Sequence, residues 1–368
     1  MVLQLGPLSS IHLREWARNT AENGHRVHVA GFVPKGMRAI DFADVAEEVH
    51  RGPDPRPPLT ALEWAPWVRR LVKRLRPAVV QAHQPPVWGL YAALAGVHPL
   101  VVTGWGSDVY LAGRAGRLMS RPALTRADRV LAPSRHLLDT MIERGADPSR
   151  CEEVDVGVDL ELFSPGPADA GLRAELDLGD GPVVLSFRGA PPVYNLPALV
   201  DGFARLRQSV PDARLLVATG SAPLSPDVRA ALERPDLEGS LRLLGDVPHE
   251  EMPRYFRLAD VGVSVPSSDA GPRSVSEALA CGLPLVVSDL PHIRARLGDR
   301  ARFVQVDPAA IAGELGELLG APASREALAG SGREWAEANV DRADHVARLG
   351  RVLEEVQTAS RPSRRARR

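Results

Sequence analysis

The sequence predicts an α/β protein of two Rossmann-like domains that face a central cleft. The chain has 368 residues, which is more than one compact core usually holds. Short apolar runs alternate with segments whose apolar residues recur at helical spacing, in both halves of the chain. A proline-rich segment at residues 165–167 separates the halves. We therefore expect an N-terminal domain at residues 1–165 and a C-terminal domain at residues 166–340.

Composition and charge limit the function classes. Hydrophobic residues make up 44% and charged residues 25%, as in ordinary globular proteins, and the net charge of -1 does not favour nucleic acid as a partner. Cys151 and Cys281 form no spaced motif, which fits a reduced, cytoplasmic protein. The first ten residues lack the basic and apolar regions of a signal peptide, and the apolar segment 87–102 is short for a membrane span.

The chain opens with a strand–loop–helix–strand unit. Residues 2–5 form a short apolar run that ends at Gly6, residues 11–20 have helical spacing, and residues 27–30 read as the next strand. One glycine is a weak phosphate-binding signal. His12 at the start of the helix either lines a cleft or is a surface residue.

A second helix is predicted to be amphipathic, with Trp64, Trp67 and four aliphatic residues on one face. Its opposite face is basic, with Arg69, Arg70, Lys73, Arg74 and Arg76. Tryptophans beside basic residues suit an anionic membrane surface, whereas a packed helix with a solvated basic face gives the same pattern. The sequence leaves both interpretations open.

Polar residues follow the next two predicted strands. The strand predicted at residues 78–80 is followed by a polar segment that contains His83. The strand predicted at residues 100–103 leads to Trp105, Ser107 and Asp108. Ligands bind at the carboxyl ends of strands in open α/β sheets, so His83 is a candidate for the substrate site. Trp105 cannot do proton chemistry but could stack on a ring.

In the second domain, three predicted strands end in candidate ligand loops. Residues 183–187 lead to Arg188, whose guanidinium can bind a phosphate bidentately, and a helix follows from Asn195. Residues 215–218 lead to Gly220, and residues 241–244 lead to Gly245 and Val247.

Residues 266–289 form the most informative stretch, which reads PSSDAGPRSVSEALACGLPLVVSD and follows a buried strand. We expect a loop, a helix with Ser274 as its N-cap, an end at Gly282 and a strand. The helix start directs N–H groups and a positive dipole end at the loop, which suits a phosphate. Asp269 and Glu277 flank that point, and a carboxylate there can accept from a ribose or sugar hydroxyl.

This stretch resembles the signature of glycosyltransferase family 4, whose members are retaining, nucleotide-sugar-dependent enzymes of the GT-B fold. The match includes Glu277, Ala278, Leu279, Ala280, Gly282, Pro284, Val287 and Ser288, and the segment 154–165 matches the family's interdomain segment. Asp269 replaces the family's first Glu. The resemblance implies that the second domain binds the donor and the first the acceptor. It also implies that a helix at residues 341–360 crosses back to the first domain, ahead of a basic, solvated tail at 361–368.

The resemblance also implies roles for the candidate residues. Glu277 would bind the ribose and Asp269 the donor sugar, while Arg188 and the amides of Ser274 and Val275 would bind the diphosphate. Further donor contacts would come from the loops that contain Gly271, Asn195, Gly220, Gly245 and Val247, with Gly6 and His83 near the acceptor. Two departures stand out: no Lys occurs near Asn195, and Trp105 replaces a family His.

We therefore predict a metal-independent transfer of a sugar from a nucleoside diphosphate sugar to an acceptor, with no further cofactor. No Asp-x-Asp pair and no Cys or His cluster with zinc spacing occurs in the sequence. The acceptor is a small molecule, a glycan or a lipid-linked compound, and weak contact with the inner face of the membrane stays open. The missing Lys leaves a second hypothesis, a non-catalytic protein that binds a sugar nucleotide or partner. A sugar-nucleotide epimerase is a third.

Overall fold

The computed structural model describes residues 1–55, 60–220 and 223–359. The chain divides into two compact units, and we describe each by itself. Unit 1 contains Met1–Gly157 and the segment that begins at Arg342, and unit 2 is Val158–Asp341. The predicted basic tail at 361–368 lies outside the described residues.

Unit 1 is built on a seven-stranded sheet in which neighbouring strands are parallel, in the order β3-β2-β1-β4-β5-β6-β7. The strand order reverses between β1 and β4, and ligands bind at the carboxyl ends of strands at such a switch point. Gly6 follows β1 and His83 ends β4, so both predicted residues lie at this point. The strands are β1 (Val2–Leu5), β2 (Val27–Gly31), β3 (Glu48–Arg51), β4 (Val79–His83), β5 (Leu100–Thr103), β6 (Arg129–Ala132) and β7 (Cys151–Glu153).

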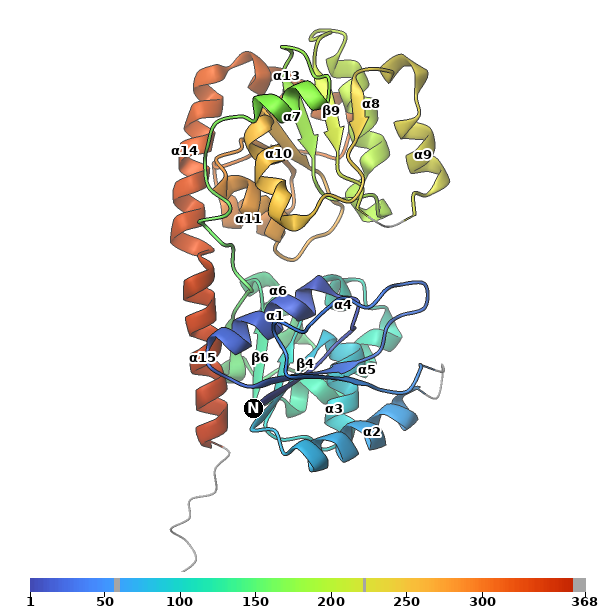
Figure 1. Ribbon diagram of the computed structural model, residues 1–368, viewed down its shortest axis with the longest axis vertical. Helices are drawn as coiled ribbons and strands as arrows, with labels where there is room; N and C mark the ends of the chain where they lie inside the picture. The colour runs from blue at the N-terminus through green and yellow to red at the C-terminus, as the bar shows by residue number, and fades with distance from the viewer. Residues whose placement is uncertain (56–59, 221–222, 360–368) are drawn as a thin grey trace, which may run out of the picture. The chain divides into compact units, whose positions relative to one another are not determined.

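The C-terminal helix α15 (Arg342–Ala359) belongs to unit 1, where it packs against α1 (Ile11–Glu22) (Figure 1). Its Leu349 and Leu353 share a buried cluster with Trp16 of α1. The side chain of Asn23 donates a hydrogen bond of 2.7 Å to the carbonyl of Val346. The other helices of unit 1 are α2 (Thr60–Leu75), η1 (Gln84–Gly89), α3 (Leu90–Leu94), α4 (Ser107–Tyr110), α5 (Arg114–Arg126), α6 (Arg135–Glu143) and η2 (Pro148–Arg150).

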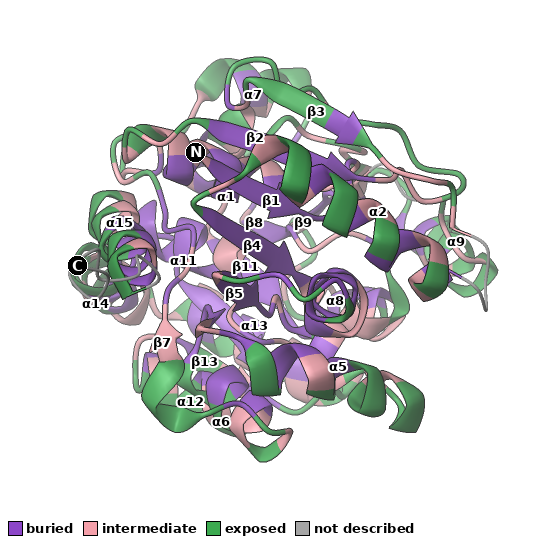
Figure 2. Cartoon of the chain, turned by 90° about the horizontal axis from the view of Figure 1, so that it is seen from below, coloured by how far each residue is buried: buried purple, intermediate pink, exposed green. Residues whose placement is uncertain are grey.

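The aromatic face of α2 packs inward, which corrects the idea that both of its tryptophans meet a membrane. Trp64 is fully buried, and its ring centroid lies 5.0 Å from that of Trp88 and 4.9 Å from that of Trp67. Burial of so large an apolar ring in the protein core removes it from any lipid surface. The outward face, green in Figure 2, carries Leu62, Arg69, Arg70, Lys73 and Arg74.

Unit 2 is a six-stranded sheet in the order β10-β9-β8-β11-β12-β13, again with parallel neighbours. Its switch point lies between β8 and β11. The strands are β8 (Val183–Ser186), β9 (Arg214–Val217), β10 (Leu241–Leu243), β11 (Val261–Ser264), β12 (Leu285–Ser288) and β13 (Arg302–Val304). The helices are α7 (Ala170–Glu175), η3 (Pro192–Tyr194), α8 (Leu196–Leu206), α9 (Pro226–Leu232), η4 (Pro235–Leu237), η5 (His249–Glu251), α10 (Met252–Leu258), α11 (Arg273–Ala280), α12 (Pro291–Leu297), α13 (Pro308–Gly320) and α14 (Pro322–Asn339).

Helix α11 ends as the sequence predicts and begins differently. At its end, Gly282 has φ +74°, and the Gly282 and Leu283 amides donate back to carbonyls of the last turn at 2.9 and 3.0 Å. At its start, the N-cap is Pro272 and not Ser274. The Pro272 carbonyl accepts from the Val275 amide at 3.0 Å, so the helix starts two residues earlier than predicted and Ser274 lies in its first turn.

None of the helices in the described part of the chain is both long and apolar enough to cross a membrane.

Candidate functional site

The switch point of unit 2 holds a cluster centred on Arg188, which follows β8. Its Nη1 donates a hydrogen bond of 2.5 Å to the Ser274 hydroxyl, and its Nη2 pairs with a carboxylate oxygen of Asp269. The Arg188 and Asp269 side chains are each only 11% exposed. Arg188 therefore connects the end of β8 to the loop before α11 and to its first turn, where a helix favours negative charge.

Asp269 serves two purposes within its loop. One carboxylate oxygen accepts from the amides of Ala270 and Gly271 at 2.7 and 3.3 Å, and the other faces Arg188. The His292 ring lies 2.7 Å from the Asp269 carbonyl. The aspartate thus fixes the loop that contains Gly271 while it neutralises a predicted phosphate ligand.

Asn195 lies near the position at which the family resemblance implies a lysine. Its backbone is left-handed, with φ +50°, a conformation that asparagine tolerates better than most residues. The side-chain amide donates to the Val265 carbonyl and the Ser267 hydroxyl, both at 2.8 Å. Asn195 thereby ties the loop after β8 to the loop after β11, and no positive charge stands there. The neighbouring Tyr194 ring lies 4.7 Å from the Arg188 guanidinium carbon, a cation–π distance.

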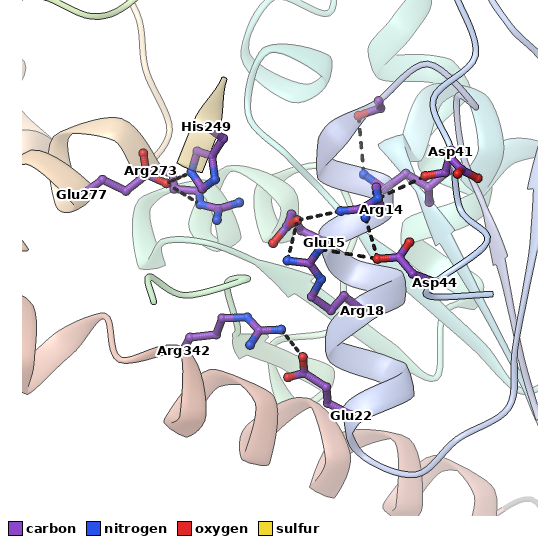
Figure 3. Close-up of polar contacts among 12 residues, drawn as sticks. Arg14, Glu15, Arg18, Glu22, Asp41, Asp44, His249, Arg273, Glu277 and Arg342 are labelled. Atoms are coloured by element: carbon purple, nitrogen blue, oxygen red, sulfur yellow. Dashed lines mark hydrogen bonds and ion pairs between the residues drawn. The ribbon is translucent and has the colours of Figure 1, made fainter. Parts of the chain in front are cut away.

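Glu277 is buried on α11 and contacts two basic side chains (Figure 3). His249 Nε2 and Arg273 Nε lie 2.7 and 2.8 Å from the same carboxylate oxygen, Oε1. Burial acts to raise the pKa of Glu277, but the His249 hydrogen bond and the Arg273 charge outweigh it, so the pKa is lowered. Glu277 is therefore an ionised acceptor in a dry environment.

Sequence reasoning missed His249 and Arg273. Arg273 could have been found, because a residue four positions before Glu277 on a helix lies on the same face. His249 comes from η5, 28 residues before Glu277, and no local pattern connects the two.

Two further predicted residues of unit 2 lie side by side. Gly220 follows β9 and Gly245 follows β10, and the Gly220 amide donates to the Gly245 carbonyl at 3.0 Å. Both have φ near +70°, which favours glycine. Val247, two residues on, is partly buried.

In unit 1, Gly6 is a close-packing position. A Cβ atom on Gly6 would lie 2.8 Å from the Leu13 side chain, and one on Gly31 would lie 1.8 Å from the Gly6 carbonyl oxygen. Glycine therefore lets β1 turn tightly between α1 and β2, whatever else the loop binds.

His83 is fully buried, and its ring accepts a hydrogen bond at Nδ1 from the Trp105 indole at 3.2 Å. Because an indole N–H can only donate, His83 carries its proton on Nε2. Burial lowers the pKa of His83 to about 3, so the ring is neutral at pH 7. Its Nε2 has no partner among the described residues. Trp105, in place of the family His, thus fixes the tautomer of His83.

Asp108 holds the loop of Trp105. One of its oxygens accepts from the amides of Trp105 and Gly106 at 3.0 and 2.7 Å. Burial raises the pKa of Asp108 to about 6, although those backbone hydrogen bonds act in the opposite direction. Asp108 therefore supports the loop through its backbone contacts.

Each half of the chain matches a family of known proteins. The family Glycosyltransferase Family 4 matches residues 9–162, and Glycosyl transferases group 1 matches residues 182–321. The chain belongs to the family-4 type of glycosyltransferases. The D-inositol 3-phosphate glycosyltransferase of Segniliparus rotundus is 32% identical over 55% of this chain and 48% of its own length. The GDP-mannose-dependent alpha-(1-6)-phosphatidylinositol monomannoside mannosyltransferase of Mycolicibacterium smegmatis is 29% identical over 72% of each chain. The chain thus spans about half the length of the first relative and about three-quarters of the length of the second.

Solved structures place this family-4 chain in the GT-B fold. Sucrose-phosphate synthase from Thermosynechococcus elongatus has a TM-score of 0.83 at 18% identity, over 98% of this chain and 99% of that one. HepE from Anabaena in complex with UDP has a TM-score of 0.79 at 17% identity, over 96% and 99%. At these identities the likeness establishes the fold and nothing about substrates.

Proposed function

We propose that this protein transfers a sugar from a nucleoside diphosphate sugar to a hydroxyl acceptor, with retention of configuration and without a metal ion. The observation that carries the proposal is the grouping of Arg188, Ser274 and Glu277 around α11 at the switch point of unit 2. This grouping offers a diphosphate ligand and a ribose ligand on one short helix.

The diphosphate would bind at Arg188 and the start of α11. A guanidinium and a helix N-terminus both stabilise the negative charge that develops on the leaving group, which is the largest electrostatic demand of the reaction. Both carboxylates of the site, Asp269 and Glu277, are paired with basic side chains. This arrangement suits an anionic ligand better than a metal cation.

Donor binding would then exchange the partner of Arg188. An incoming phosphate competes with Asp269 for the guanidinium, because both are anions and Arg188 is 11% exposed. The released Asp269 would be free to accept from a hydroxyl of the donor sugar. Asp269, which stands where the family has a glutamate, thus neutralises Arg188 until a ligand replaces it.

Glu277 would accept from the ribose hydroxyls. Its Oε1 is shared by His249 and Arg273, so Oε2 is the oxygen available for a ligand. The two basic neighbours keep the carboxylate ionised, and an ionised acceptor makes the stronger hydrogen bond.

The acceptor would be a phosphorylated polyol or its lipid-linked form, bound by unit 1. Support comes from two relatives, whose names specify inositol 3-phosphate and phosphatidylinositol monomannoside. His83 Nε2–H, buried and without a partner among the described residues, would donate to an oxygen of the acceptor. The protein would act in the cytoplasm, with the basic face of α2 as its contact with anionic lipid.

A second candidate is a non-catalytic protein that binds a sugar nucleotide. The pairing of Arg188 with Asp269 favours it, because the cation expected to bind phosphate is already neutralised and Asn195 supplies no second one. The lowered pKa of Glu277 and the retained donor loops favour the enzyme.

A thermal-shift screen with nucleoside diphosphates, followed by sugar-nucleotide turnover with inositol phosphates, tests the proposal. A ligand at about 100 times its dissociation constant stabilises the fold by about 2.7 kcal/mol. Stabilisation by a nucleoside diphosphate with sugar transfer supports the enzyme, and stabilisation without release of nucleoside diphosphate supports the binding protein. No stabilisation by any of them contradicts both.

A further inference from the structure

A second cluster of ligand-type side chains lies in unit 1, at the edge of the sheet formed by β2 and β3. In the parallel register His28 pairs with Glu48, and Ala30 pairs with His50. Because side chains alternate along a strand, His28, Glu48 and His50 share one face of the sheet. The 22 residues that separate the two histidines hide this grouping from any local sequence motif.

The two imidazoles meet directly. His28 Nδ1 and His50 Nε2 lie 3.0 Å apart, and the rings stack with an interplanar angle of 15°. A Glu48 carboxylate oxygen lies 3.7 Å from His28 Nδ1. One ligand atom from each residue lies within 4.8 Å of the other two.

These spacings are close to those of a zinc site. Zinc binds imidazole nitrogen at about 2.0–2.1 Å and carboxylate oxygen at about 2.0–2.2 Å, so neighbouring ligand atoms in a tetrahedron are about 3.3 Å apart. The observed 3.0 and 3.7 Å lie on either side of that value. We infer that His28, Glu48 and His50 bind a divalent transition metal ion, with zinc as the best match.

The surroundings of the cluster support the site. The histidines are buried, at 7% and 6% exposed, whereas Glu48 is exposed at the open edge of the sheet and gives an ion access (Figure 2, β3). A Glu47 oxygen lies 3.4 Å from His28 Nε2, as a carboxylate that orients a metal-bound imidazole would. A fourth coordination position would be filled by water.

Arg74 opposes the site. Its guanidinium lies 3.4 Å from His50 Nδ1, so its positive charge repels a metal ion bound to the cluster unless the Arg74 side chain moves away. The side chain extends from the last turn of the surface helix α2 and is exposed, so it can move into solvent. Removal of Arg74 should therefore strengthen metal binding, a result that a purely structural hydrogen-bonded cluster does not predict.

The bound ion would hold β3 to β2. β3 is the edge strand, and its other residues are exposed. His28 and Glu48 lie at the amino ends of β2 and β3, whereas ligands of open α/β sheets bind at the carboxyl ends, so zinc here would stabilise the fold and take no part in sugar transfer.

Zinc titration by calorimetry, on chelator-treated protein, tests the inference. We expect one zinc ion per wild-type chain, and a rise in Tm of about 5–10 °C at 100 times the dissociation constant. His50→Asn should abolish binding, Glu48→Gln should weaken it at least tenfold, and Arg74→Ala should strengthen it. His98→Asn, which alters an exposed histidine of the same unit, is the matched control and should bind as wild type.

Glu48→Gln keeps the result decisive if His50→Asn does not fold, because Glu48 is exposed. Cobalt substitution should give the visible absorption of a tetrahedral site in the wild type and not in Glu48→Gln. Absence of stoichiometric zinc binding overturns the inference, as does binding that is equal in wild type, His50→Asn and Glu48→Gln.

Discussion

Arg188 and Asp269 form an ion pair at the carboxyl edge of the unit 2 sheet, although the family resemblance assigns the first to the diphosphate and the second to the sugar. Asp269 is one carbon–carbon bond shorter than the family's glutamate, and its other carboxylate oxygen accepts from the amides of its own loop.

Asp269→Asn should bind a nucleoside diphosphate more tightly while turnover falls at least tenfold. The change removes the anion that competes for Arg188, which is worth up to about 1 kcal/mol or roughly fivefold in affinity. Calorimetry and steady-state kinetics measure the two effects. Asp201→Asn, which breaks a pair between Asp201 and Arg234 in the same unit, is the control. Weaker binding by Asp269→Asn would be inconsistent with the exchange of partners.

Asp269→Glu should not increase the activity with the natural donor. The Asp269 loop is fitted to the shorter side chain through the amides of Ala270 and Gly271. Kinetics of this variant beside the wild type measure the effect, and a faster variant would point to a partly degraded active site.

Arg188→Ala should reduce catalytic efficiency roughly ten- to hundredfold, since a hydrogen bond to a charged group contributes about 1.5–3 kcal/mol. Arg70→Ala, on the exposed face of α2, should have little effect with a soluble acceptor. Equal losses in the two variants would remove the diphosphate assignment.

Glu277→Ala should nearly abolish donor binding, because the buried carboxylate is the proposed ribose ligand. The matched control is Glu337→Ala on α14, which also removes a glutamate paired with an arginine at (i, i+4) but is exposed. Calorimetry with the nucleoside diphosphate compares them. Unchanged affinity in Glu277→Ala, with the fold intact by circular dichroism, would exclude the ribose role.

Asp108→Asn should change the pH dependence of stability. The folded-state pKa of Asp108 is raised to about 6 from an ordinary value of 3.8, so between those pH values the folded state binds the proton more tightly than the unfolded state. Wild-type stability therefore falls as pH rises through this window, by about 3 kcal/mol from this group. The Asn variant lacks that loss. Denaturant unfolding of both proteins at pH 4.5 and pH 7.5 measures about 2 kcal/mol of this loss, because pH 4.5 lies inside the window. Parallel pH profiles would refute the burial argument.

The sequence predicted the alternation of strands and helices, the loops at the strand ends and the end of α11 at Gly282, since each follows from local periodicity or a glycine. It could not predict the start of α11, because the Ser274 hydroxyl accepts from Arg188, which the sheet brings to it from 86 residues away, and the helix begins at Arg273. It also could not show that Trp64 packs inward, since an amphipathic pattern does not say whether protein or lipid covers the apolar face.

The sequence analysis named residues of the candidate site but not the contacts between them. Arg188, Asp269 and Glu277 were each identified from spacing and resemblance, but their contacts with Ser274 and His249 depend on which strand ends the sheet brings together. Pairing across 81 residues, as between Arg188 and Asp269, is set by the strand order of the sheet.

The most direct test of the account is turnover of a panel of nucleoside diphosphate sugars by the wild-type protein, in the presence of EDTA, with inositol phosphates as acceptors. Released nucleoside diphosphate is quantified, and the anomeric configuration of the product is determined by NMR. The account predicts release that persists in EDTA, depends on the acceptor and gives a product with the configuration of the donor. A stable complex with a nucleoside diphosphate sugar that releases no product with any acceptor, or a product of inverted configuration, would contradict it.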